Sequence, residues 1–138
     1  MYLVTKQGTP KKDNDNTKCY MIIEKYQDSG LLTKIPELGI VQTTELAPHP
    51  TKTEVGYIID TGFETYWSYT KAMKIAIKYY FHPIIIECCI PRKSKFYEGH
   101  AYKSISFRSE QLIFNKIIED EDSIKCSKIY KDPRKIRI

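Results

Sequence analysis

The hydrophobic residues of this chain fall in short runs, most of them rich in β-branched and aromatic side chains and separated by Gly, Pro, Asp and Asn. Runs of this kind are typical of β-strands joined by turns. The predicted strands are residues 1–6, 19–26, two short pieces within 30–46 that Pro36 and Gly39 break, 54–60, 63–67, 83–90, 101–107 and 111–118. Exposed loops are expected at 7–17, at 47–53 and in the basic stretch after residue 91.

One segment, residues 68–81, has the period of an amphipathic helix instead. Ser68 is the expected N-cap. Pro83 ends the helix, because proline disfavours helical geometry at the residue before it and donates no backbone hydrogen bond. The apolar stripe at helical spacing consists of Ala72, Met73, Ala76, Tyr79 and Tyr80. The polar face carries Lys71, Lys74 and Lys78.

The run PIIIECCI at residues 83–90 predicts a central strand that is buried on both faces. It contains two adjacent cysteines, Cys88 and Cys89, whose side chains point to opposite faces of a strand. Such a pair lacks the spacing of zinc ligands, and an apolar environment disfavours the thiolate that a nucleophile needs. We interpret both as buried structural thiols, with reactive or metal-binding thiols as the alternative.

One helix among many short strands indicates an α+β fold with a mostly antiparallel, strongly curved sheet that cradles the helix. The length of 138 residues fits a single domain, 1–138. An acidic turn begins the segment 119–138 and is followed by a basic C-terminal stretch that can form an edge strand.

Composition narrows the class of protein. Apolar residues make up 41% and charged residues 28%, as in ordinary globular domains, and the net charge of +5 mildly favours polyanionic partners. No apolar run approaches the roughly 18 residues of a membrane span, so no membrane association is expected. The N-terminus lacks the pattern of a secretory signal, and the four cysteines are therefore expected to be reduced thiols in the cytoplasm.

Basic and aromatic residues gather after the central strand and suggest a binding surface around residues 92–102. Its candidate members, with two residues from the segment before the helix, are Arg92, Lys93, Lys95, Tyr97, His100, Tyr66 and Glu64. The helix lysines and the tail residues Arg134, Lys135 and Arg137 could join them against a phosphate-bearing partner. Tyr69 and Tyr102 also lie near these bases, and tyrosine can stack on a nucleotide base. Solvated surface lysines and half-buried sheet tyrosines are the alternative.

Several catalytic and nucleotide-binding motifs are absent from the sequence. It contains no G-x-x-x-x-G-K-[ST], no G-x-G-x-x-G, no H-E-x-x-H and no G-x-S-x-G. The three histidines are isolated along the chain, which argues against a histidine-centred hydrolase. No metal site is expected.

Several short motifs are distributed over most of the chain, namely Gly62-Phe63-x-Thr65-Tyr66, the strand IIIECCIP with its basic loop, Tyr97-x-Gly99, and Ser109 before an apolar strand. Together they resemble small uncharacterised proteins of phages and gut bacteria. The proteins of this group carry G-F-H-[ST]-[FY] and C-x-I-P-K-G-[ST] patterns, from which Glu64 and Lys93 depart. The resemblance implies a mobile-element origin and no particular chemistry.

The order of elements is also similar to the C-terminal half of ADP-ribosyltransferase folds. Those enzymes hold the nicotinamide ribose with a glutamate just before a late strand, and Glu110 in FRSEQLIF has this position. The resemblance would make NAD the cofactor and Glu110 the catalytic residue. Arg108 replaces the first residue of the Glu-x-Glu pair, and Glu64-Thr65-Tyr66 replaces the serine-threonine-serine motif, which favours a non-catalytic sheet.

We therefore expect a small cytoplasmic binding protein of phage or prophage type without a cofactor. It would act stoichiometrically on a host protein, a nucleotide or a nucleic acid through the basic, tyrosine-rich surface. An ADP-ribosyltransferase-like enzyme is the alternative. The oligomeric state stays open, as does the question of whether Glu64, Tyr66, Tyr97 and Glu110 share one pocket.

Overall fold

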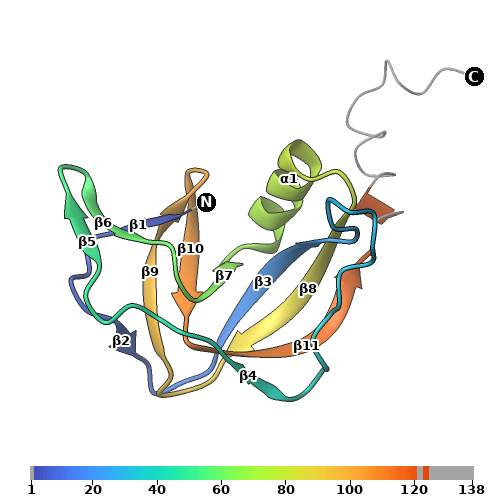
Figure 1. Cartoon of the computed structure of the whole chain (residues 1–138). Helices are drawn as coiled ribbons and strands as arrows, with labels where there is room; N and C mark the ends of the chain where they lie inside the picture. Colours follow the sequence, from blue (N-terminus) through green and yellow to red (C-terminus); the bar gives the residue numbers. More distant parts are fainter. Residues whose placement is uncertain (1, 121–122, 125–138) are drawn as a thin grey trace, which may run out of the picture.

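The computed structural model describes residues 2–120 and 123–124, and this part of the chain forms one antiparallel sheet with a helix packed on it (Figure 1). The order of strands in the sheet is β4-β11-β8-β3-β7-β10-β9-β1-β6-β5, with β2 paired to β9 beside this path. The expected α+β class with a mostly antiparallel sheet is confirmed. The elements are β1 (Leu3–Thr5), β2 (Lys11–Lys12), β3 (Thr17–Glu24), β4 (Val41–Thr43), β5 (Thr51–Thr53), β6 (Gly56–Ile59), β7 (Phe63–Tyr66), α1 (Tyr69–Tyr79), β8 (Pro83–Ile90), β9 (Lys95–Ala101), β10 (Ser104–Ser109) and β11 (Gln111–Glu119).

Strand β8 is central to the core, as its continuous apolar run predicts. It pairs along its full length with β3 on one side, and on the other side Ile85 to Cys89 pair with β11 through two register shifts. Alternate side chains enter two different apolar clusters, because successive residues of a strand point to opposite faces. One cluster contains Ile84, Ile86, Cys88 and Ile90 with Phe96, Phe107, Leu112 and Phe114. The other contains Ile85 with Ile22, Tyr66 and the buried face of α1.

Helix α1 lies over β3, β7 and β8 (Figure 1) and begins as its sequence predicts. The Ser68 hydroxyl accepts a hydrogen bond from the Lys71 backbone N–H at 3.3 Å, which satisfies one of the donors that a helix start leaves open. The buried face consists of Ala72, Met73, Ile75 and Ala76. The expectation that Tyr79 belongs to this face is wrong, since Tyr79 is 48% exposed and Ile75 takes the core position.

Two of the expected loops contain short strands. Within 7–17, Lys11 and Lys12 pair with the start of β9. Within 47–53, Thr51–Thr53 forms a hairpin with β6. Both segments lack a hydrophobic run, and their pairing depends on a neighbouring strand that supplies backbone partners. Local composition does not encode such a partner.

The basic stretch after β8 is also not the loop that the sequence suggests. A turn at residues 91–94 is followed at once by β9, which occupies most of the interval 92–102. The predicted strand 101–107 is interrupted, because Tyr102 and Lys103 form a two-residue turn between β9 and β10. The sequence does not predict this turn, because the turn contains no glycine and strong β-formers lie on both sides of it.

The interval 30–46 contains one strand, β4, instead of two, since its first apolar piece contributes only a bridge between Tyr26 and Leu32. The expectation for 119–138 concerns mainly residues outside the described part of the chain. Glu119 ends β11, and the tail residues Arg134, Lys135 and Arg137 lie outside the described residues.

Gly99 allows β1 to approach β9 closely. A Cβ atom built on Gly99 would lie 2.0 Å from the Val4 carbonyl oxygen and 2.8 Å from the Val4 carbonyl carbon. These atoms belong to the backbone of β1, which pairs with β9 through Val4 and His100. Glycine is therefore required here by space rather than by its backbone angles.

We predict that Gly99→Ala lowers the free energy of unfolding by about 3 kcal/mol or more, because the added methyl group displaces β1 from β9. Gly39→Ala is the matched control, with a positive φ of 81° but open space around the new Cβ. The control should lose only about 1–2 kcal/mol from the left-handed backbone. Urea unfolding of both variants measures the difference. Equal losses of unfolding free energy would show that a clash with β1 is not what requires glycine at position 99.

Candidate lysine and tyrosine pocket

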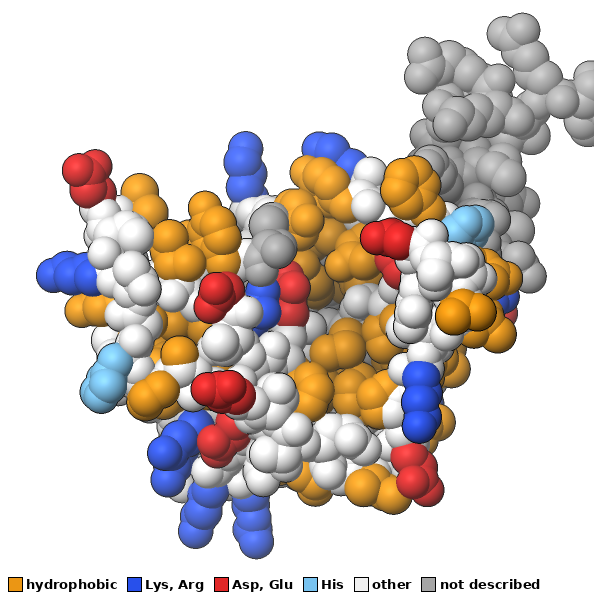
Figure 2. Space-filling model, in the orientation of Figure 1, with side chains coloured by type: hydrophobic (Ala, Val, Ile, Leu, Met, Phe, Trp, Pro, Cys, Tyr) orange, Lys and Arg blue, Asp and Glu red, His pale blue; other side chains and the backbone are white. Residues whose placement is uncertain are grey.

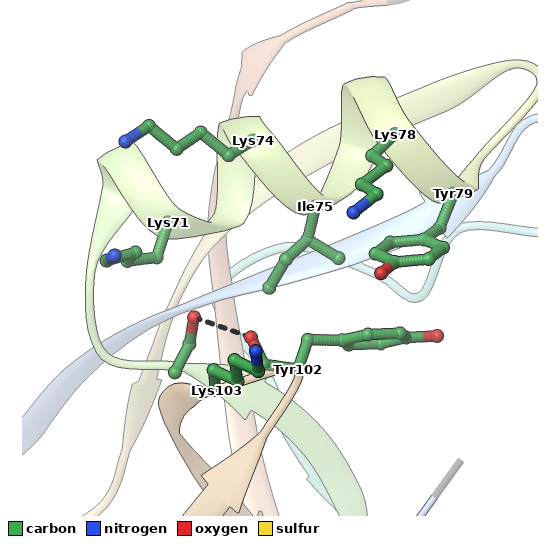
Figure 3. A pocket seen from close by; sticks show the side chains of 8 residues that line it. Lys71, Lys74, Ile75, Lys78, Tyr79, Tyr102 and Lys103 are labelled. Atoms are coloured by element: carbon green, nitrogen blue, oxygen red, sulfur yellow. Dashed lines mark hydrogen bonds between the residues drawn. The ribbon is translucent and has the colours of Figure 1, made fainter.

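A basic recess of about 340 Å³ lies between α1 and the turn that joins β9 to β10 (Figure 3). The helix contributes Lys71, Lys74, Ile75, Lys78 and Tyr79, and the turn contributes Tyr102, Lys103 and Ser104. We call this recess the lysine pocket. Figure 3 shows the rings of Tyr79 and Tyr102 facing each other at one end, whereas Lys71 extends from the helix at the other end.

The helical period brings the three helix lysines to the pocket. Lys71, Lys74 and Lys78 are spaced by three and four residues, so they lie on one face of α1. The opposite face of the helix is apolar and packs on the sheet, which leaves the lysines on the exposed side. The polar face that the sequence predicts is therefore the helix wall of the pocket.

The turn that forms the other wall has an unusual backbone. Ala101 pairs with Ser104, and the two residues between them have positive φ angles, 50° at Tyr102 and 59° at Lys103. Two positive φ angles in a two-residue hairpin are the pattern of a type I′ turn, which Asn-Gly adopts most readily. Tyr102 and Lys103 therefore occupy strained backbone positions, and both side chains line the pocket beside the helix.

The two tyrosines of the pocket stack on each other. The ring centroids of Tyr79 and Tyr102 are 4.4 Å apart, with 29° between the ring planes. The Lys78 ammonium lies 5.2 Å from the Tyr79 ring centre, in the range of a cation–π contact. Burial raises the pKa of the Tyr102 hydroxyl, and the negative charge of Glu64 adds to this effect. The Tyr102 hydroxyl is thus a neutral hydrogen-bonding group at neutral pH.

The pocket is electropositive. Four of its eight lining residues are lysines, and none of the others is acidic. Over residues 2–120 and 123–124, no carboxylate forms a salt bridge with Lys71, Lys74, Lys78 or Lys103. Like charges at such a recess repel one another, and a bound anion would relieve this repulsion.

The residues that the sequence proposed as one surface around 92–102 are distributed over different parts of the structure. The Arg92 backbone N–H donates to Asn16, and Lys93 occupies a tight turn with a φ of 64°. His100 lines a separate cavity of about 530 Å³ beside β1. Tyr97 is fully buried and donates its hydroxyl to the Ala47 carbonyl oxygen at 2.6 Å, so it lies beneath the surface.

Glu64 and Tyr66 do meet, together with Arg108 on the neighbouring strand. The Glu64 carboxylate accepts hydrogen bonds from the Tyr66 hydroxyl at 3.1 Å and from Arg108 at 3.2 Å. Glu64 and Arg108 are cross-strand partners, which explains why their side chains lie on the same face. Tyr66 and Arg108 are almost fully buried, so this group links β7 and β10 beneath α1 as an internal polar cluster.

Glu110, the residue proposed as catalytic in a transferase, lies at the joint between β10 and β11. Its carboxylate accepts a hydrogen bond from the Lys95 backbone N–H at 3.0 Å. Its own backbone bonds to Lys95 and to Thr44. Glu110 therefore connects three strands, and it lines neither the lysine pocket nor the cavity that contains His100. Its catalytic role stays a prediction.

The described cysteines are free thiols in an apolar environment. Cys19 and Cys88 are fully buried, whereas Cys89, on the opposite face of β8, is partly exposed. Burial raises the pKa of Cys19 to about 12 and also raises those of Cys88 and Cys89. The interpretation as core thiols thus holds fully for Cys88 and only in part for Cys89.

The sequence singled out the helix lysines and Tyr102 but did not identify Lys103 or Tyr79 as members of the site. The spacing of the helix lysines was visible in the sequence. The turn was not, because Tyr-Lys is not a typical turn pair. Among the described residues, no group of His, Cys, Asp and Glu side chains could hold a metal ion. The described part of the chain also includes no helix of the length and apolarity needed to cross a membrane.

Comparison with known proteins gives no family for this chain. No family model matches it, and no curated protein or solved structure has a significant match. The two resemblances found in the sequence therefore stay predictions. The function has to be inferred from the residues and the geometry of the lysine pocket.

The buried thiol of Cys19 predicts a loss of stability at high pH. The unfolded thiol titrates near pH 9 and the folded one near 12, so the unfolded state loses its proton first. The contribution to stability is complete below pH 9 and falls between pH 9 and 12, by about 1.4 kcal/mol per pH unit. Urea unfolding of wild type and Cys19→Ala across this pH range should show that the free energy of unfolding declines less steeply with pH in the variant. Identical slopes would contradict this assignment.

Proposed function

We propose that this protein is a small non-catalytic binding protein, of the phage type that its sequence resembles, which holds a phosphate-bearing ligand in the lysine pocket. The observation that carries the proposal is the convergence of four lysines and two stacked tyrosines from two distant elements on one recess. Phosphate oxygens are acceptors for several ammonium groups at once. Lysine, as a mobile point charge, suits such a ligand.

The arrangement of charge distinguishes this recess from an ordinary solvated face. Elsewhere on the described surface, Lys11 and Lys18 lie 3.5 Å from Glu98 and Glu87, so their charges are partly compensated. In the space-filling view, lysine and arginine side chains project mostly at the periphery of the face shown, whereas most acidic ones lie nearer its middle (Figure 2). The lysine pocket combines positive charge with concavity and without an acidic lining residue. These three properties together support a site for an anion.

The size of the recess favours a small ligand or one group of a larger one. A volume of about 340 Å³ lies at the lower end of the range for small-molecule sites. A host protein or a nucleic acid could present a phosphate group to the same lysines. Either partner would still depend on the charges of the pocket, and the effect of salt would be strong, because exposed charges are screened over about 10 Å at 0.1 M ionic strength.

Charge reversal tests this proposal. We predict that Lys74→Glu and Lys103→Glu, made together, weaken binding of tripolyphosphate by about a hundredfold at low salt, since each reversal changes attraction into repulsion near the anion. Isothermal titration calorimetry at two salt concentrations measures the affinity. Both side chains are exposed, and circular dichroism should show an unchanged fold.

The matched control is Lys52→Glu together with Lys34→Glu, which changes the net charge equally at exposed positions outside the pocket. It should weaken binding by less than about threefold, because distant exposed charges are screened. Equal effects of the two double variants would show that only net charge matters, and the proposal would fail. The absence of any binding of tripolyphosphate to the wild type would refute it directly.

A further inference from the structure

The tyrosine pair indicates which kind of phosphate compound the pocket takes. A site for a simple polyanion needs positive charge but no aromatic surface. Here the stacked rings of Tyr79 and Tyr102 form one end of the same recess whose other residues are mainly lysines (Figure 3). We propose that the ligand is a nucleotide whose base continues the stack of Tyr79 and Tyr102 while its phosphates contact the lysines. This inference rests on the proposed function.

The exposure of Tyr79 supports this proposal. Tyr79 is 48% exposed and lies in the last turn of α1, outside the buried face of the helix. Its aromatic surface is therefore accessible beside the lysines, and bases of any sequence can stack on such a ring. The Lys78 ammonium lies 5.2 Å from the centre of the same ring, so a positive charge adjoins the aromatic surface.

The backbone strain of the turn gives an independent argument. Tyr102 and Lys103 both have positive φ angles, which disfavour every residue with a side chain except Asn and Asp. Strain of this kind is concentrated at functional sites, where a particular side chain must be presented. The only side chains that the strained turn presents are the second ring of the stack and the fourth lysine of the pocket.

A comparison of ligands with and without a base separates the contribution of the base to binding from that of the phosphate. AMP, GMP, CMP and UMP are compared with ribose 5-phosphate, which has a similar phosphate and sugar but no base, by calorimetry with the wild-type chain. We expect at least one nucleotide to bind about tenfold tighter than ribose 5-phosphate. In Tyr102→Leu, which keeps Lys103, this preference should disappear, so that the nucleotide and ribose 5-phosphate bind within about threefold of each other.

A second variant tests the role of the strained turn. Tyr102→Asn with Lys103→Gly creates the preferred type I′ pair, so its Tm should equal or exceed that of the wild type, whereas nucleotide binding should be lost. Loss of binding in a chain of undiminished stability cannot be attributed to unfolding. Retained binding in this variant would overturn the inference.

The outcomes distinguish this inference from the proposed function. Equal affinities for nucleotides and ribose 5-phosphate, with tripolyphosphate still bound, would overturn the nucleotide and leave the anion site. Failure of all these compounds to bind would overturn both. A tetranucleotide that binds more than tenfold tighter than the best mononucleotide would overturn the choice of a free nucleotide, because strand binding requires contacts beyond one pocket.

Discussion

The structure depends on the burial of β8, whose first half is buried on both faces. The strand separates two apolar clusters, one formed with the phenylalanines of β9, β10 and β11 and the other with helix α1. Hydrogen bonds to β3 and β11 satisfy its backbone on both sides. A strand in this position favours apolar residues throughout, and the run Ile84–Ile86 supplies them. The remaining elements are arranged around this strand, and Ile85 belongs to the cluster that contains the buried face of α1.

The lysine pocket is a consequence of this packing. The apolar face of α1 is fixed against β3, β7 and β8, so the helical period places Lys71, Lys74 and Lys78 outward. The hairpin of β9 and β10 pairs with β7 on the same sheet, and its turn reaches the helix from the side. Both walls are therefore supported by the core, while the charges between them lie in solvent. The core thus fixes the backbone positions of the four lysines, whose exposed side chains extend into solvent.

The internal polar cluster explains how this side of the sheet tolerates ionisable residues. Glu64 accepts hydrogen bonds from both Tyr66 and Arg108, so the charge of the carboxylate is compensated within the sheet. Removal of one partner from such a buried group is more costly than its net contribution to stability suggests. Burial keeps the pKa of Tyr66 above its ordinary value, with Glu64 adding to the shift. The cluster thus joins β7 to β10, the strand that carries Ser104 of the pocket.

The sequence by itself determined the elements whose patterns are local. The boundaries of β8 and the position of α1, with its cap at Ser68 and its lysine face, were all predictable, because apolar runs and helical period are properties of neighbouring residues. The tertiary structure decided the rest. The strands β2 and β5 exist through pairing with other strands, Tyr97 is buried by the sheet around it, and the turn at Tyr102 and Lys103 is imposed by the two strands that it joins. The pocket combines both kinds of feature, since the contact between Tyr79 and Tyr102 joins residues that are distant along the chain and is encoded by no local pattern.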